Sequence, residues 1–249
     1  MIPDVWFYVL AVPAVMIAGV SKGGFGSGVG IIAVPLMALR VPPPQAAAIM
    51  LPILVAMDIT GFWAYRKTFH AGHLKVLLPA AAVGIGVGWA TFGLLGVAEV
   101  RLLIGVIAVV FPLVHWFDLR PSGPSRAPRA WGTFWGAVSG FTSFLAHAGG
   151  PPVNVYLLPQ RLEKRQYVGT TVMFFTAVNA LKLVPYGQLG QFRAENLLTS
   201  AVLLPLAPLG IWLGLWMQGR VTDVAFYRIC YVLLFLTGVK LLWDGVGGL

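Results

Sequence analysis

Residues 19–30 read GVSKGGFGSGVG, and six of these twelve positions are glycine. The flanking segments, residues 4–20 and 28–39, are strongly apolar. Each glycine in a helix interior costs about 1 kcal/mol relative to alanine, so a regular helix is not expected to continue through this stretch. Irregular backbone within a bilayer persists only where protein buries it or where it lines a polar cavity. The stretch therefore predicts a broken membrane helix beside a cavity that is a candidate binding site.

The composition of the whole chain agrees with a membrane environment. Hydrophobic residues make up 58% of the 249 residues, charged residues make up 10%, and the mean hydropathy is +0.84. Soluble domains contain roughly 25% charged residues. Because one helical crossing needs about 20 apolar residues, this length allows about eight to ten crossings joined by short loops. We therefore expect an all-α polytopic membrane protein.

The net charge of +9 does not indicate nucleic-acid binding in this chain. The lysines and arginines lie mainly in short loops between apolar segments, where positive charge is a signal for membrane topology. The single cysteine, Cys230, leaves no possibility of an intrachain disulfide or a multi-cysteine metal site. We expect the lipid bilayer as the environment and no metal, cofactor or nucleic-acid partner, while the sequence leaves a homodimer open.

The apolar segments of the two halves follow the same order. When the chain is compared with itself at an offset of 121 residues, matching residues align without gaps. Asp58 then pairs with Asn179 and Tyr65 with Tyr186, and the other matches are Gly19 with Gly140, Leu36 with Leu157 and Gly93 with Gly214. A polar linker, residues 118–130, separates the copies. The sequence predicts a first membrane repeat over residues 1–120 and a second over 121–249, each with roughly four to five membrane segments.

Basic loop residues distinguish between two orientations of these repeats. If the opening segment of each half crosses the membrane once, seven basic loop residues lie on one side and six on the other. If each opening segment enters and returns as a hairpin, the distribution is ten against three, and the positive-inside rule favours this arrangement. Each half then crosses an odd number of times. The sequence thus predicts two inverted repeats, each opened by broken or re-entrant helices, with both termini outside.

The second half has its own break at the matching position, residues 140–154, which read GFTSFLAHAGGPPVN. Pro151 and Pro152 suit the first turn of a new helix, where their missing N–H groups would be unpaired anyway. Both breaks are thus expected to point helix N-termini into the protein, and such ends attract anions. Lys22 would add a full positive charge. The alternatives are close helix packing for the glycines and a lysine that extends to the membrane surface.

Other polar residues lie inside apolar spans. An intramembrane carboxylate such as Asp58 is functional by default, either as a proton site or as the ion-pair partner of Lys22, and a static ion pair is the structural alternative. Asn179 is either a ligand or a packing amide. His147 either binds an anion or a proton or is only hydrogen-bonded in the core. We assign Asp58 and Lys182 to ion pairing or coupling.

The motifs exclude nucleotide-driven transport and argue against an enzyme. No Gly-Lys-Ser/Thr ending follows the glycine run, and no G-x-G-x-x-G spacing occurs in a strand context. Ser143 and His147 have the spacing of neighbours on a helix, but the break removes that geometry and no oxyanion partner is recognisable. We therefore expect no catalytic residues.

At these residues the chain resembles the sulfite exporter TauE/SafE family of membrane permeases. The resemblance rests on GVSKGGFGSGVGIIAVPLMAL (residues 19–39) with the following PPPQAAA, and on GFTSFLAHAGGPPVNVYLLPQ (residues 140–160) with the later YVGTT. It covers essentially the whole chain. It implies export, or in some members uptake, of small sulfur-containing anions such as sulfite or sulfonates, and it places the two broken regions at residues 21–30 and 142–154.

We therefore expect a secondary transporter of the bacterial inner membrane that exports a small sulfur-containing anion by alternating access, driven by the membrane potential or a proton gradient. A permease for another small anion, or one for uptake, is the nearest alternative. An intramembrane enzyme and a structural membrane protein are alternatives of other classes. The candidate substrate-binding residues are Ser21, Lys22, Gly24, Gly26, Gly28, Thr142, Ser143, His147, Gly149, Gly150, Asn154 and Asn179.

Overall fold

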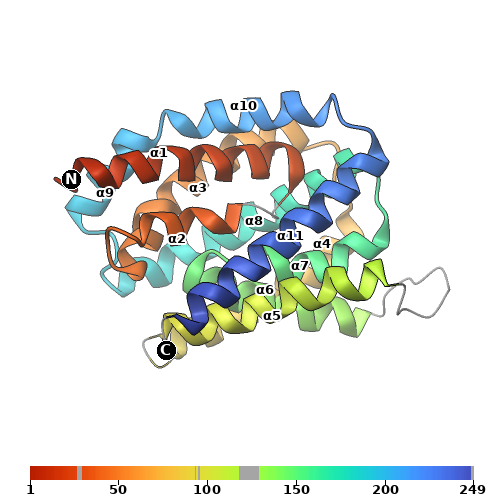
Figure 1. The fold of residues 1–249 in the computed structure, drawn as a ribbon, viewed down its shortest axis with the longest axis horizontal. Coiled ribbons are helices and arrows are strands. Elements are labelled where there is room, and N and C mark those ends of the chain that lie inside the picture. The colour runs from red at the N-terminus through yellow and green to blue at the C-terminus, as the bar shows by residue number, and fades with distance from the viewer. Residues whose placement is uncertain (27–29, 93, 95, 118–128, 248–249) are drawn as a thin grey trace.

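A computed structural model describes residues 1–26, 30–92, 94, 96–117 and 129–247, and this part of the chain contains helices and no strand (Figure 1). The first half comprises α1 (Val5–Val20), the π-helical turn η1 (Ser21–Phe25), the 3-10 turn η2 (Gly30–Ile32), α2 (Ala33–Met37), α3 (Pro43–Tyr65), α4 (Ala71–Ala90) and α5 (Val97–Trp116). The second half comprises α6 (Arg129–Ala146), α7 (Gly150–Leu157), the 3-10 turn η3 (Leu158–Gln160), α8 (Lys164–Gln188), α9 (Ala194–Leu203), α10 (Leu206–Gln218) and α11 (Asp223–Val246).

Several helices begin where the sequence supplies a cap. The Asp4 carboxylate accepts a hydrogen bond from the backbone N–H of Trp6, 3.0 Å away, at the start of α1. The Thr222 hydroxyl accepts a hydrogen bond from the backbone N–H of Ala225 at the start of α11. Prolines occupy the first turns of α3 and α7, where no helical partner is lost. Short polar or proline-containing segments thus set the starts of long apolar helices.

Four of the described helical stretches are long and apolar enough to cross a membrane: Val5–Phe25, Pro43–Tyr65, Ala71–Ala90 and Lys164–Gln188. A fifth candidate combines α9 and α10, which are bent by 43° relative to each other. Pro205 lies at the bend, because proline cannot donate a helical N–H bond. The number of crossings in each half stays a prediction.

The bundle carries apolar side chains outside and polar side chains inside. Trp6, Trp63, Trp212 and Trp243 are among the large hydrophobic residues that are exposed. Buried polar residues include Ser139, Thr142, Thr170, Thr171, Asn179, Asn196, Thr199 and Ser200. Soluble proteins mostly keep polar residues at the surface, whereas hydrocarbon chains solvate exposed apolar residues well. The surface therefore fits a bilayer, and the polar interior is where binding chemistry is available.

The opening segment of each half returns to the end where it began. In the first half, Arg40 follows α2, and its Nε donates to Oδ2 of Asp4, just before α1, over 2.9 Å. This hydrogen bond is the main reason that the pKa of Asp4 is lowered from its usual value. In the second half, Gly132 near the start of α6 packs against the ring of Tyr156 near the end of α7. Both opening segments are thus hairpins whose tips are the breaks.

Each opening hairpin packs against a helix of the other half. α1 lies along α10, as the red and blue helices of Figure 1 show, and α6 lies along α4. A Cβ atom on Gly19 would lie 2.8 Å from Cα of Gly210, and one on Gly84 of α4 would overlap the carbonyl of Ala137 in α6. Small residues therefore permit backbone-to-backbone packing, and the two halves are interlocked.

Matching helices of the two halves cross in opposite directions. Asp58 of α3 contacts Asn179 of α8, whereas Gly61, further along α3, contacts Val172, which is earlier in α8. The contacts of α5 with α11 have the same reversed order, with Gly105 against Leu242 and Ala108 against Gly238. Both pairs of matching helices are consequently antiparallel.

The offset between the halves is constant only in part. α8 begins 121 residues after α3 (164 − 43), α9 begins 123 residues after α4 (194 − 71), and α11 begins 126 residues after α5 (223 − 97). The second half therefore contains two additional residues in α8, which has 25 residues against 23 in α3, and three more between the starts of α9 and α11. The match of Gly93 with Gly214 lies beyond this point, and Gly93 lies outside the described residues.

Candidate anion-binding site

The first break combines close packing with a sharp turn. At Ser21 the chain changes from the α-helix of α1 to the π-helical turn η1, a feature that often marks functional sites. Gly26 ends the turn with a φ of +71°, a conformation that suits glycine. A Cβ on Gly24 would overlap the backbone of Gly214 in α10. These two glycines therefore serve the turn and the packing respectively, and Gly28 lies outside the described residues.

The second break is held together by side-chain hydroxyls. The helix α6 ends at Ala146, and Pro151 and Pro152 occupy the first turn of α7 as the sequence predicted. Ser139 Oγ donates to the Gly149 carbonyl over 2.7 Å, and Thr142 Oγ1 lies 3.1 Å from the Ala148 carbonyl. Buried carbonyls need such partners. The break thus keeps its polar backbone satisfied without a regular helix.

Two tyrosines hold the hairpin tips in the same way. Tyr65 donates its hydroxyl to the carbonyl of Gly23 over 2.5 Å, and Tyr186 donates to the carbonyl of Phe144 over 2.7 Å. Tyr65 and Tyr186 are 121 residues apart, and so are Gly23 and Phe144. Both tyrosines are buried. The two breaks therefore have matching supports, each supplied by the helix that follows the hairpin.

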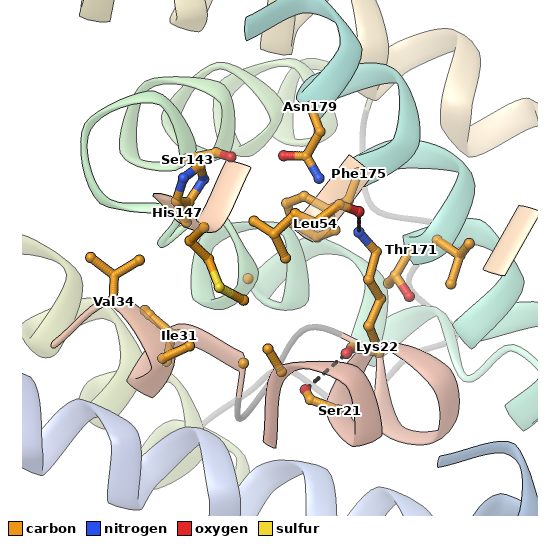
Figure 2. Close-up of a pocket in the computed structure, with 17 residues that line it drawn as sticks. Ser21, Lys22, Ile31, Val34, Leu54, Ser143, His147, Thr171, Phe175 and Asn179 are labelled. Carbon is orange, nitrogen blue, oxygen red and sulfur yellow. Dashed lines mark hydrogen bonds between the residues drawn. The ribbon is translucent and has the colours of Figure 1, made fainter. Parts of the chain in front are cut away.

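A cavity of about 60 Å³ lies between the two hairpin tips and the middle of α3 and α8 (Figure 2). Its polar wall consists of Ser21, Lys22, Ser143, His147, Thr171 and Asn179. Its apolar wall consists mainly of Ile31, Val34, Met50, Leu54, Val172 and Phe175. Polar groups thus reach one small space from both breaks and from α8.

Lys22 and Asp58 form a buried ion pair beside this cavity. The ammonium of Lys22 contacts Oδ1 of Asp58 and lies 3.3 Å from the Leu54 carbonyl, to which it donates. The Asn179 amide donates to Oδ2 of Asp58 over 2.7 Å, and the Thr176 hydroxyl donates to Oδ1 over 3.1 Å. Both carboxylate oxygens of Asp58 are therefore occupied, and this residue lies behind the cavity wall.

Lys182 is fully buried, and its ammonium has only neutral acceptors among the described residues. Nζ lies 3.1 Å from the Ser143 carbonyl, 3.0 Å from the Ser143 hydroxyl and 2.7 Å from Nδ1 of His147. His147 in turn directs Nε2 at the carbonyl of Ala47, 2.9 Å away. The three donors of an ammonium group are thus all used.

The charges around the cavity do not cancel. Lys22, Asp58 and Lys182 are the buried lysine and aspartate side chains of the described chain, with exposed fractions of 8%, 3% and 0%. In their ordinary protonation states, two ammonium groups and one carboxylate would leave one positive charge. An uncompensated buried charge is strongly unfavourable. An anion in the cavity would neutralise it.

The comparison with protein families agrees with this chemistry. The profile of one family, described as Sulfite exporter TauE/SafE, matches residues 11–241 of the chain. The chain belongs to that family. TauE/SafE proteins are membrane permeases for sulfur-containing anions, so this protein is a multi-pass membrane protein that functions in transport. Searches of curated proteins and of solved structures found no match.

The structure of this TauE/SafE protein brings together seven of the twelve candidate substrate-binding residues. The seven that line the cavity are Ser21, Lys22, Gly26, Ser143, His147, Gly150 and Asn179. The two candidate ion-pair or coupling residues, Asp58 and Lys182, contact wall residues from behind. The cavity therefore joins residues that are more than 100 positions apart in the chain.

The remaining candidates support the site or lie elsewhere in the break. Gly24 packs against α10. Thr142 and Gly149 belong to the hydrogen bonds within the second break. Asn154 accepts a hydrogen bond from the hydroxyl of Tyr167 over 2.7 Å. These described residues are absent from the cavity wall.

Thr171 is a polar wall residue that the sequence reasoning did not select. Its hydroxyl donates to the Val168 carbonyl, 2.8 Å away, inside α8. It is the last residue of the YVGTT stretch that carries part of the TauE/SafE resemblance, so that motif contained the signal. The apolar wall residues Leu54 and Phe175 carry no such signal, because they look like any other residue of an apolar helix.

Proposed function

We propose that this TauE/SafE protein exports a small sulfur-containing anion, sulfite or an organosulfonate, across the cytoplasmic membrane through this cavity. The observation that carries the proposal is that two lysines, Lys22 and Lys182, and a single aspartate, Asp58, are buried around a small polar space. With both lysines protonated, these three side chains carry one positive charge. Such a site attracts one anion and repels cations. The direction follows the exporters after which the family is described.

The cavity suits a small oxyanion. A single water needs about 10–15 Å³ of such space, so about four water-sized groups fit, and sulfite consists of one sulfur and three oxygens. In the proposed complex, Lys22 supplies charge from the first break, and the Ser143 hydroxyl donates to the anion. The Ser21 and Thr171 hydroxyls donate to the Gly26 and Val168 carbonyls and would turn to the anion only by releasing them. The Asn179 amide and the His147 ring flank these groups. The apolar wall would contact the organic part of a sulfonate.

The arrangement of the helices supports a transporter built from inverted repeats. The matching pairs α3/α8 and α5/α11 are antiparallel, as a two-fold axis in the membrane plane requires. Both opening segments are hairpins, which gives each half the odd number of crossings that inversion needs. In this arrangement both termini lie outside, and alternating access opens the cavity to one side at a time.

The membrane potential is sufficient to drive export of an anion. An inside-negative potential supplies about 2.3 kcal/mol per charge at 100 mV. This energy corresponds to about fifty-fold accumulation of a monoanion outside. If one proton leaves with each monoanion, no net charge moves, and outward gradients of the anion and of the proton drive export in place of the potential.

The proposal is tested by efflux from proteoliposomes that contain the purified protein. Sulfite and methanesulfonate are loaded separately, and their release is followed at imposed potentials for the wild type, Lys22→Ala and Lys75→Ala. Lys75 is exposed and serves as the control. We expect release of the loaded anion from wild-type vesicles, its loss in Lys22→Ala and its retention in Lys75→Ala. Absence of release of both anions from wild-type vesicles would overturn the proposal.

A further inference from the structure

His147 holds an unusual backbone conformation in the wall of the cavity. Its φ is +52°, and it is one of two described non-glycine residues with a positive φ. A side chain with Cβ adopts this conformation at a cost of about 1–3 kcal/mol, and such residues cluster at functional sites. The conformation places the imidazole between α3 and α8, where its two nitrogens face different partners.

The two partners fix where the protons of the ring lie. The Ala47 carbonyl accepts only, so the Nε2 atom that faces it carries a proton. In a neutral imidazole Nδ1 is then an acceptor, and Lys182 must donate to it. The alternative is an imidazolium that donates from Nδ1 to a neutral amine. In both of these states the pair carries one positive charge, and a neutral amine that donates to the neutral ring gives the uncharged state of the same contact.

We propose that the His147–Lys182 pair is the proton-binding site of the transporter and takes up one proton whenever an anion occupies the cavity. The inference rests on the proposed function, because it requires an anion beside His147. The added proton comes from the aqueous side to which the cavity is open and binds to Nδ1. Once Nδ1 is protonated, Nδ1–H and the lysine N–H are both donors, so they cannot form a hydrogen bond with each other. An oxygen of the anion accepts from Nδ1–H, and Lys182 keeps its bonds to Ser143.

The surrounding groups explain why proton and anion bind together. Lys22 from η1 and Lys182 from α8 are both positive and disfavour a second proton on the empty pair. Asp58 from α3 is paired with Lys22, and Tyr186 of α8, whose ring centre lies 6.1 Å from that of His147, is neutral. An anion in the cavity supplies the missing negative charge. Each ligand therefore raises the affinity for the other.

Asp58 is the other candidate for the proton, and its contacts argue against it. Lys22 and Thr176 contact Oδ1, and Asn179 donates to Oδ2. Three donors thus already point at the two carboxylate oxygens. Asp58 also lies behind the wall, so an anion cannot contact it. The geometry thus assigns coupling to the histidine and the second lysine.

The test measures protons and anions in the same vesicles. Methanesulfonate is the probe because the sulfonate stays ionised near neutral pH and carries no proton itself. An outward methanesulfonate gradient is imposed with the potential clamped to zero, and the pH of the lumen and the anion content are recorded. We expect about one proton to leave with each anion. Anion release without proton movement would overturn this inference and leave the proposed function intact.

Matched variants separate the site from the fold. In His147→Gln, the amide nitrogen can donate to Ala47 and the amide oxygen can accept from Lys182, but no proton can be added. The ratio of protons to anions is expected to fall at least about tenfold in this variant. His73→Gln removes a half-buried histidine outside the cavity and should keep the ratio. An unchanged ratio in His147→Gln contradicts the assignment, and a ratio near zero in the wild type contradicts it without any variant.

Discussion

The amide of Asn179 donates a hydrogen bond to the carboxylate of Asp58 over 2.7 Å, and these residues occupy the same position in the two halves of the chain. In the proposed inverted-repeat arrangement, matching residues that contact each other lie close to the two-fold axis. The candidate site is therefore centred where α3 and α8 cross. Since one half supplies a carboxylate and the other an amide, the pair contributes a single negative charge.

The charge at this crossing sets the affinity for an anion. In Asn179→Asp the new carboxyl group lies within hydrogen-bond distance of Asp58, so the two share one proton at low pH. As the pH rises and the second group ionises, its charge opposes the anion, and the half-saturation concentration for methanesulfonate should rise by at least about tenfold. It is measured as initial efflux against anion concentration. Asn179→Ser removes the amide without adding charge and should keep most of the affinity. An equal loss in both variants would contradict the charge argument.

The Lys22–Asp58 pair should contribute to both stability and transport, and a double variant separates them. Lys22→Met leaves a buried carboxylate without its cation and should destabilise the protein by about 3–5 kcal/mol in detergent unfolding. Lys22→Met with Asp58→Leu removes both charges and should recover most of that stability, but not anion flux. If the double variant transports normally, the pair is static. Asp4→Asn, at the exposed pair with Arg40, should leave stability unchanged.

Two glycines of α4 provide a test of the helix contact. A Cβ on Gly84 would overlap the backbone of Ala137 in α6, whereas one on Gly86 would meet nothing within 4 Å. Gly84→Ala should therefore push α4 and α6 apart and lower the free energy of unfolding by about 1–3 kcal/mol. Gly86→Ala should be neutral or stabilising by up to about 1 kcal/mol. Equal effects of the two substitutions would rule out the described packing of α4 on α6.

Removing the hydroxyl of Tyr65 or that of Tyr186 should lower the stability of the protein to a similar extent. Tyr65→Phe and Tyr186→Phe each remove one hydrogen bond to a break carbonyl, and each should lower the free energy of unfolding by about 1–3 kcal/mol because a buried carbonyl loses its donor. Tyr8→Phe, at a half-buried hydroxyl bonded to the Ile2 carbonyl, is the control and should have a smaller effect. A loss in only one of the two halves would contradict matching roles for the breaks.

Much of this architecture could be predicted from the sequence because membranes impose simple rules. The length of the apolar segments predicted the helices. The glycine run and Pro151–Pro152 predicted the two breaks. The hydrogen bond between Asp58 and Asn179 was not predicted, although the two residues match at an offset of 121 residues. The TauE/SafE resemblance is confirmed by the family profile over residues 11–241.

Other features depend on packing that the sequence does not display. The contact between Lys182 and His147 joins residues 35 positions apart across two helices, and no periodicity predicts it. The role of Gly24 was ambiguous, because the same residue type serves a binding loop or a close helix contact. The bend at Pro205 was missed because proline is tolerated in many membrane helices.

Each opening hairpin packs on a helix of the other half, and this packing restricts how the two halves can move relative to each other. Since α1 is packed on α10 and α6 on α4, neither half can tilt as a whole without breaking backbone-tight contacts at Gly19 or Gly84. The rigid bodies of a rocking motion would then be composite. One rigid body would combine α1 with α10, and the other would combine α4 with α6. The unit that moves would then differ from the repeat predicted from the sequence.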